Sequence, residues 1–105
     1  MTSKLLALHA SAEMDVEVAL AYYQSHTTSK LSEKFMSALS ASLRFLCDYP
    51  KAGSLRLGQQ IGRSQIRSWP ISHFPYLVMY RESPEQVEVF RVLHQRQDLL
   101  KLIKD

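Results

Sequence analysis

The sequence predicts an α+β fold in which a small antiparallel sheet packs against an N-terminal helical hairpin. The spacing of the apolar residues carries this prediction, because it changes near Pro50 from helical periodicity to strand-like runs. The length of 105 residues suits one domain, which we expect to span residues 1–105. The expected order is a strand, two helices, three strands and a short C-terminal helix.

The N-terminal half is predicted to contain one strand and a helical hairpin. Residues 4–9 form a short apolar run, which is too brief for a helix. Helices are expected over 11–25 and 30–48, with Ser11 as N-cap of the first and a break at 25–29 between them. The apolar face of the first helix is formed by Ala12, Val16, Ala19 and Tyr23. The second helix is expected to stop at Tyr49, because the residue before a proline avoids helical geometry.

The C-terminal half is predicted to supply the sheet. Strands are expected over 65–71, 76–80 and 86–94, followed by a helix over 99–104. Pro70 indicates an edge position or a bulge, since proline cannot donate to a strand ladder. The run 76–80 is continuously apolar, so this strand should be central or covered on both faces. The turn at Ser83-Pro84-Glu85 makes the last two strands antiparallel.

Composition excludes several classes of protein. Apolar residues make up 46% of the chain, which is too many for a disordered tail. No run approaches the roughly 18 apolar residues that a membrane span requires. The N-terminus lacks the pattern of a signal peptide, and the single cysteine, Cys47, cannot form an internal disulfide. We therefore expect a cytoplasmic protein without a membrane partner, in which Cys47 is a buried small apolar residue.

The excess of positive charge lies in the second half of the chain. Residues 53–105 hold eight of the 13 Lys/Arg side chains and five of the 10 Asp/Glu side chains, whereas the first half is balanced. Six of these cations are arginines: Arg56, Arg63, Arg67, Arg81, Arg91 and Arg96. Arginine suits bidentate recognition of phosphate or carboxylate, so an acidic partner or RNA is one interpretation. A solvated, slightly basic sheet is the other.

Four segments in order resemble the RelE/ParE toxin superfamily of bacterial type II toxin–antitoxin systems, whose members are also called plasmid stabilisation proteins. The matching residues are Ala12, Asp15 and Tyr22-Tyr23; Phe35, Leu39, Leu46, Pro50 and Gly53; Phe74–Arg81, which reads FPYLVMYR; and Val89–His94, which reads VFRVLH, with Arg96 and Asp98. They are similar to the family patterns "A..D......Y", "F...L....L...P..G", "FPYLIYYR" and "RVLHGRRD". The resemblance covers most of the chain.

The resemblance implies a fold, a partner and two alternative targets. Members of the superfamily pack a helical hairpin on a small antiparallel sheet. They are neutralised by a cognate antitoxin that wraps around the toxin, which implies a toxin–antitoxin hetero-oligomer. ParE-like members inhibit DNA gyrase, whereas RelE-like members are endoribonucleases that cleave mRNA in the ribosomal A site. The resemblance implies no cofactor.

The residues at the C-terminal end favour the ParE-like branch. A RelE-like enzyme presents arginines and lysines with a tyrosine or histidine near the C-terminus, and here that catalytic set would be Arg81, Arg91, His94 and Arg96. The terminal helix has no tyrosine, and Tyr76 stands where a catalytic arginine is expected. We therefore expect a gyrase inhibitor without catalytic residues. A ribosome-dependent endoribonuclease and a non-toxic, antitoxin-binding member remain the alternatives, so whether the chain is an enzyme stays open.

The residues expected to bind a partner are Arg67, Tyr76, Arg81, Arg91, His94 and Arg96. His94 is either a group that exchanges protons near neutral pH or a strand-end histidine bonded to the backbone.

Three further polar residues have two interpretations each. Arg81 and Arg91 either form a phosphate-binding pair or make ion pairs with Glu82 or Glu88. Asp98 is either a structural residue, as a helix N-cap or a partner of Arg96, or an acid catalyst. The four histidines, His9, His26, His73 and His94, have no ligand spacing, so no metal site is expected.

Overall fold

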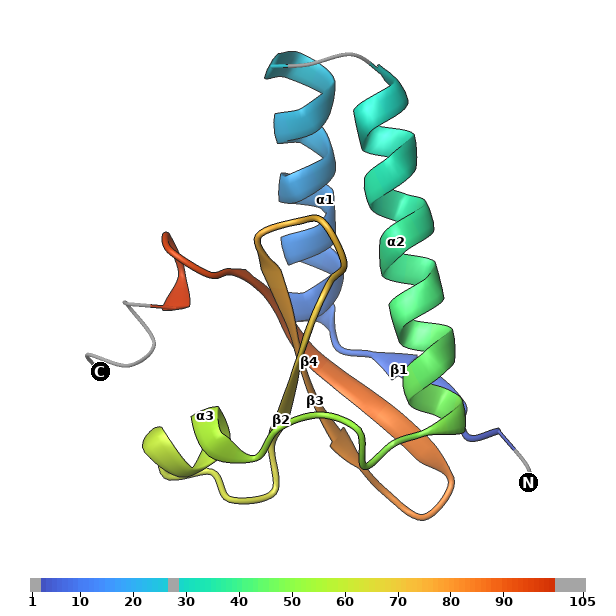
Figure 1. Cartoon of the computed structure of the whole chain (residues 1–105), viewed down its shortest axis with the longest axis vertical. Helices are drawn as coiled ribbons and strands as arrows, with labels where there is room; N and C mark the ends of the chain where they lie inside the picture. Colours follow the sequence, from blue (N-terminus) through green and yellow to red (C-terminus); the bar gives the residue numbers. More distant parts are fainter. Residues whose placement is uncertain (1–2, 27–28, 100–105) are drawn as a thin grey trace.

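Two long helices lie side by side on one face of a four-stranded sheet, and a short helix packs on the opposite face (Figure 1). The computed structural model describes residues 3–26 and 29–99. Its elements in chain order are β1 (Leu5–Leu8), α1 (Ala10–His26), α2 (Ser29–Asp48), α3 (Arg56–Gln60), β2 (Arg67–Pro70), β3 (Tyr76–Glu82) and β4 (Gln86–His94). The α+β class and the antiparallel helical hairpin are therefore confirmed.

The sheet is mixed and not wholly antiparallel as predicted. Its strand order is β1-β4-β3-β2, and β1 runs parallel to β4, with Leu5 opposite Gln86. The other two pairs, β2 with β3 and β3 with β4, are antiparallel. The direction of β1 follows from the path of the chain. The helical hairpin separates β1 from the rest of the sheet, and so long a connection permits parallel pairing.

β3 lies inside the sheet and is covered on both faces, as its continuous apolar run predicts. On the hairpin side, one cluster contains the strand residues Tyr76, Val78, Tyr80, Val87, Val89 and Val92 and the helix residues Ala12, Ala19, Tyr23, Phe35, Leu39 and Leu46. On the other side, Met79 and Leu93 pack with Leu57 of α3 and with Ile66. The two faces of one strand thus belong to two separate apolar clusters.

A β-bulge interrupts the pairing of β3 with β4. Met79 lies opposite Arg91, but the next residue, Tyr80, lies opposite Val89. Phe90 is therefore the extra residue on β4. The extra residue shifts the alternation of β4 side chains between the two faces of the sheet. Arg91 therefore does not lie on the face that the alternation before the bulge would give it.

Several boundaries differ from the predicted ones. The first helix begins at Ala10 and continues through Ser25 to His26, so Ser11 lies inside it and the break is shorter than expected. The strand over 65–71 is limited to Arg67–Pro70, an edge strand that ends in its proline.

Two other predictions concern helices. Helix α3 was not predicted, because five residues are too few to show a period. Of the terminal helix predicted over 99–104, all but Leu99 lies outside the described residues.

Candidate functional site

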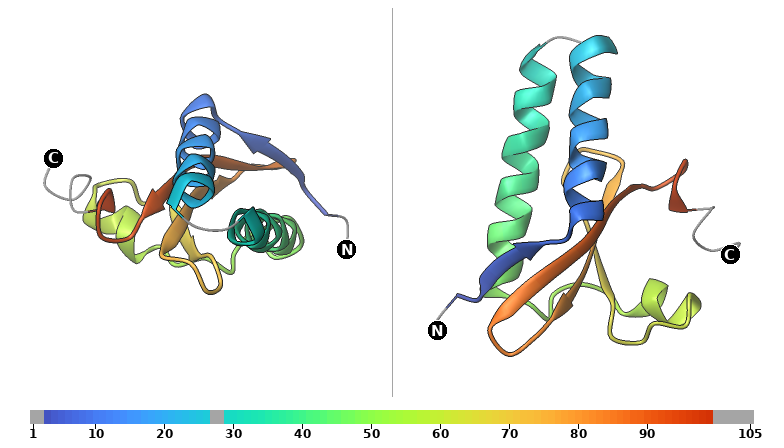
Figure 2. Two further views of the ribbon diagram at one scale, coloured as in Figure 1. Left: turned by 90° about the horizontal axis from the view of Figure 1, so that it is seen from above. Right: turned by 180° about the vertical axis from the view of Figure 1, so that it is seen from behind.

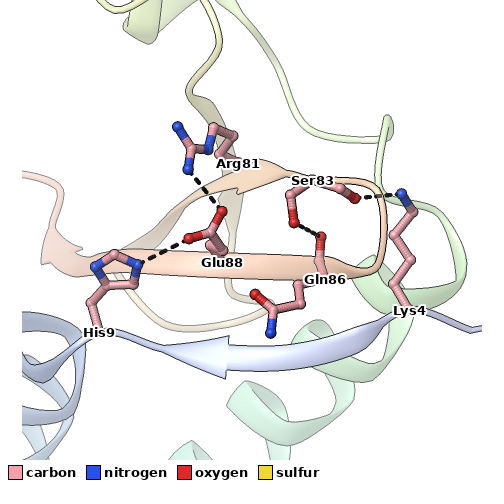
Figure 3. Close-up of polar contacts among 6 residues, drawn as sticks. All are labelled: Lys4, His9, Arg81, Ser83, Gln86 and Glu88. Carbon is pink, nitrogen blue, oxygen red and sulfur yellow. Dashed lines mark hydrogen bonds and ion pairs between the residues drawn. The ribbon is translucent and has the colours of Figure 1, made fainter.

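Arg81 and Glu88 face each other across β3 and β4 on the face that carries α3 (Figure 3). Arg81 Nη2 donates to Glu88 Oε2 at 2.8 Å, and His9 Nε2 lies 3.4 Å from Glu88 Oε1. The hydrogen bond from Arg81, with a smaller contribution from His9, holds the pKa of the Glu88 carboxyl below its ordinary value. The predicted ion pair between Arg81 and Glu88 is therefore present, and the charge of Arg81 is offset.

The bulge residue Phe90 lies between two members of this cluster. The guanidinium carbon of Arg81 is 5.5 Å from the centre of the Phe90 ring, and the ring centres of His9 and Phe90 are 4.4 Å apart. These contacts join β3, β4 and the segment between β1 and α1. Arg81 and His9 therefore stabilise the sheet through their contacts with Phe90.

Arg91 pairs with neither Glu82 nor Glu88, contrary to the prediction. Its Nε and Nη2 donate to the two carboxylate oxygens of Asp15 in α1, at 2.8 and 3.0 Å. The same carboxylate accepts the backbone N–H of Val92 at 2.9 Å. This hydrogen bonding raises the pKa of Arg91 above its ordinary value. Pairing across 76 positions of sequence has no local signal, although Asp15 is one of the residues that carry the family resemblance.

Arg67 holds the turn that follows α2. Its Nη1 donates to the carbonyl oxygens of Lys51 and Gly53, at 3.1 and 2.9 Å. Tyr80, which lies opposite Arg67 in the sheet, donates its hydroxyl to Pro50 O at 2.7 Å and accepts the Gly53 N–H at 2.9 Å. A guanidinium that was expected to bind a partner is thus engaged with the backbone of its own chain.

Lys4 fastens the start of β1 to the turn between β3 and β4. Figure 3 shows its side chain reaching Ser83, and Nζ donates to Ser83 O at 2.6 Å. It also forms an ion pair with Glu82 at 2.9 Å. Glu82, one of the two carboxylates expected to pair with the arginines, therefore pairs with a lysine.

His94 ends β4 and organises the turn that follows. Its Nδ1 accepts the backbone N–H groups of Arg96 and Gln97, at 3.1 and 3.2 Å. The carboxylate of Asp98 accepts the His94 N–H at 2.9 Å, and the Asp98 N–H donates to His94 O at 3.1 Å. The interpretation of His94 as a strand-end histidine bonded to the backbone is confirmed. Asp98 caps this turn instead of pairing with Arg96.

Tyr76 lies against His94 in the hairpin-side cluster. The ring centres are 5.2 Å apart and nearly perpendicular, and Tyr76 is buried. Burial, with smaller contributions from the nearby Tyr23 and Asp98, raises the pKa of Tyr76 to about 12. The phenol is therefore protonated at neutral pH and cannot serve there as a base.

The predicted site residues do not share one pocket. Arg81 lies on the α3 face, whereas Tyr76 and His94 lie on the hairpin side. Arg67 and Arg91 are bonded to a turn and to α1. Within residues 3–26 and 29–99, no hydrogen bond or ion pair engages the guanidinium of Arg96. Arg96 is thus the one predicted arginine whose guanidinium makes no hydrogen bond or ion pair with the described part of the chain.

A cavity of about 480 Å³ opens on the α3 face beside Phe90. Its lining consists of His9, Ser11, Ile61, Arg63, Ile66, Met79, Phe90 and Arg91. Asp15 offsets the charge of Arg91, which leaves Arg63 as the guanidinium in the lining without an ion pair among the described residues. His9 and Arg63 were not expected here, because the first is isolated in the sequence and the second precedes a strand.

Two comparisons with known proteins match the chain. The family model described as ParE toxin of type II toxin-antitoxin system, parDE, matches residues 6–99. The chain belongs to this family. A solved structure described as the chromosomal ParDE TA system from P. aeruginosa has the same fold, with a TM-score of 0.73 and 13% identity over 88% of this chain and 96% of that chain. No curated protein sequence matches.

This ParE-family toxin carries an exposed apolar stripe on α1. Met14, Val18 and Tyr22 recur every four residues, and they are 59%, 62% and 51% exposed. A neighbouring face of the same helix, about 120° away around its axis, buries Ala12, Ala19 and Tyr23. A helix with two apolar faces has one face for the core and a second that a partner can cover. Tyr22, which the first-helix motif contributes, belongs to this second face.

The described part of this ParE-family chain has no group of three or more side chains that could hold a metal ion. Among the same residues, no helix is long and apolar enough to cross a membrane.

Proposed function

We propose that this ParE-family toxin inhibits DNA gyrase by binding and without chemistry of its own, and that a cognate antitoxin neutralises it. The observation that supports inhibition by binding is the state of the two sheet arginines. Glu88 offsets the charge of Arg81, and Asp15 offsets that of Arg91. Their guanidiniums join elements of the fold, so a reacting phosphate would have to compete with these carboxylates for them.

A RelE-like nuclease would require the opposite arrangement. RNA cleavage needs cations that stabilise a developing charge on phosphate, together with a group that transfers a proton. The histidine of the candidate set accepts two backbone N–H groups through Nδ1, and Tyr76 is a neutral phenol at neutral pH. The separate positions of Arg81 and His94 favour recognition over catalysis.

The apolar stripe on α1 supports neutralisation by a protein partner. Met14, Val18 and Tyr22 offer side chains at the spacing by which one helix packs on another. Since the net charge is only +3, affinity for the antitoxin should depend mainly on apolar burial and decrease only weakly with salt. A steep loss of binding between low and moderate salt would contradict this.

The cellular target is tested by two assays run on the same preparation. We expect purified toxin to inhibit supercoiling by gyrase at concentrations close to those of the enzyme, and to leave mRNA intact in a translating extract. Cleavage of mRNA without inhibition of gyrase would assign the protein to the nuclease branch. Inactivity in both assays would indicate a member that only binds an antitoxin.

A further inference from the structure

One long segment of the chain contains cations and no acids. Residues 49–81 hold five of the 13 Lys/Arg side chains and none of the 10 Asp/Glu side chains, so the rest of the chain is net negative. The five cations are Lys51, Arg56, Arg63, Arg67 and Arg81. Within this segment, α3 and the loop that follows it lie at the end of the molecule away from the helical hairpin (Figure 2). We call residues 54–66 the basic lobe.

The loop of the basic lobe is closely packed against α3. Arg63 N–H donates to Gly58 O at 2.6 Å, and Ile66 N–H donates to Arg63 O at 3.1 Å. Gly58 has no room for a side chain, because a Cβ there would collide with the carbonyl oxygens of Ile66 and Arg63. Ile66 and Leu57 pack in turn with Met79 of β3. The backbone that carries Arg63 is therefore fixed to the sheet.

Arg56 and Arg63 are the cations of the basic lobe, and both are exposed. Among residues 3–26 and 29–99, no hydrogen bond or ion pair engages either guanidinium. Lys51, which precedes the lobe, differs from them because it lines a pocket together with Asp48 and Glu82. Arg56 and Arg63 thus carry charge that no carboxylate of the described residues pairs with.

Arg63 lies between two adjoining hollows on the α3 face. One is the cavity of about 480 Å³ described above, and the other has a volume of about 440 Å³. They adjoin because Arg63, Ile66 and Phe90 line both. The rest of the second lining consists of Gly62, Ser64, Gln65 and Arg81. Neither lining contains a carboxylate, so an anion that enters from solvent meets cationic and neutral polar groups.

The two sheet arginines add donors to these hollows without leaving their carboxylates. Glu88 accepts from Nη2 of Arg81, and Asp15 accepts from Nε and Nη2 of Arg91, so Nη1 of each arginine has no partner among the described residues. The two side chains are 41% and 44% exposed. A guanidinium has five N–H donors, so it can keep its carboxylate and donate to a second anion.

The exposed side chains of the basic lobe are polar or cationic. They are Ser54, Arg56, Gln59, Gln60, Arg63, Ser64 and Gln65. The large apolar side chains that are exposed on the described surface all lie outside the lobe. A protein partner requires apolar or aromatic anchors at the centre of its interface, whereas arginine, glutamine and serine are residues that contact nucleic-acid phosphates. This composition favours a nucleic acid over an acidic protein.

We propose that the basic lobe binds the phosphodiester backbone of duplex DNA. Arg56 and Arg63 contact phosphates, and Ser64 and Gln65 donate hydrogen bonds beside them. The choice of DNA rests on the proposed function, because a toxin bound to gyrase lies next to the duplex on which that enzyme acts. Contacts to the backbone carry no sequence information, so the lobe strengthens attachment to gyrase on any DNA. Binding to DNA alone is weak and strongly dependent on salt, since it releases counterions.

Titration of a fluorescent DNA duplex with the purified full-length toxin, followed by anisotropy without gyrase, tests the contact. We expect saturable binding at low salt. Arg56→Gln and Arg63→Gln should each weaken it by about three- to tenfold and reduce the slope of log K against log salt concentration by about 1. Arg44→Gln, the same substitution on an exposed residue of α2, is the control and should change neither quantity. Circular dichroism verifies that each variant is folded.

Two results of this titration would overturn the proposal. One is the absence of binding to the duplex, and the other is an equal loss for Arg44→Gln. Tighter binding of an RNA duplex than of the DNA duplex would overturn the choice of DNA.

A supercoiling assay separates this proposal from the proposed function. The double variant Arg56→Gln/Arg63→Gln should require about tenfold more toxin than the wild type for half-inhibition of gyrase, and Arg44→Gln should not. If the double variant is as potent as the wild type, the contact with DNA is wrong while inhibition of gyrase stands. If the wild type binds DNA as expected but leaves gyrase active, the basic lobe is a DNA-binding surface and the proposed target is wrong.

Discussion

Asp15 holds Arg91 through both of its carboxylate oxygens, with Oδ2 2.8 Å from Nε and Oδ1 3.0 Å from Nη2. The contact lies where β1 has ended and the chain has entered α1. At that point β4 has no neighbouring strand on this side, and Oδ2 of Asp15 takes the Val92 N–H that a strand would have bound. Asp15 therefore replaces a missing strand and also neutralises an arginine.

Asp15→Asn should lower the free energy of unfolding by about 1–2 kcal/mol, because an amide binds the Arg91 guanidinium more weakly than a carboxylate does. Urea denaturation monitored by circular dichroism measures this loss. Glu13→Gln, on an exposed residue of the same helix turn, is the control and should change little. Equal losses for the two variants would show that helix charge, and not the contact with β4, is responsible.

Tyr80→Phe should cost about 1–3 kcal/mol of stability, since it leaves the Pro50 carbonyl and the Gly53 N–H without the hydroxyl that joins them. The same urea experiment checks it. Tyr49→Phe is the matched control, because Tyr49 is 52% exposed. If both phenylalanine variants were as stable as the wild type, the turn after α2 would not depend on Tyr80.

Gly53→Ala should also destabilise the protein by about 1–3 kcal/mol. A Cβ on Gly53 would lie 2.5 Å from Tyr80 Oη and 2.9 Å from Ser68 O, so the turn or the sheet must move. Combining Gly53→Ala with Tyr80→Phe should cost less than the sum of the two changes, because the phenylalanine removes one of the clashing atoms. Strict additivity in a double-mutant cycle would refute the close contact.

The contact between Arg81 and Glu88 should make stability depend on pH in a definite direction. The pKa of Glu88 is lowered in the folded state, chiefly by the hydrogen bond from Arg81, so its stabilisation is present above the ordinary value of 4.5. It is lost as the pH decreases through the lower, folded value. The difference in Tm between the wild type and Glu88→Gln should therefore shrink below pH 4.5. A difference that stays constant in this range would contradict the ion pair.

His94→Asn should preserve growth arrest and inhibition of gyrase at matched expression. The Asn oxygen can accept the backbone N–H groups that Nδ1 accepts now, while the variant has no imidazole to transfer a proton. His94→Ala should instead lose stability through the turn. If His94→Asn folds by circular dichroism but is not toxic, the imidazole itself is required and a nuclease becomes the better hypothesis.

Local pattern was sufficient for the helical hairpin and for most of the sheet. The helical spacing from Ala12 to Tyr23 and the proline after Tyr49 placed two helices within a few residues of their observed bounds. The continuous apolar run of β3 predicted a strand covered on both faces, since each of its side chains needs an apolar neighbour. Helix α3 and the bulge at Phe90 were missed, because neither repeats long enough to create a period.

The sequence by itself determined the helices, the central strand and, through four short motifs, the family to which the chain belongs. Only the tertiary structure decided that β1 runs parallel to β4, and which carboxylate each arginine meets. The reason is physical. Periodicity indicates which side chains of a helix or strand are buried, and this pattern is visible within one element of the sequence. The partner of Arg91 is Asp15, 76 positions away, and the packing of α1 along the end of β4 alone brings the two together.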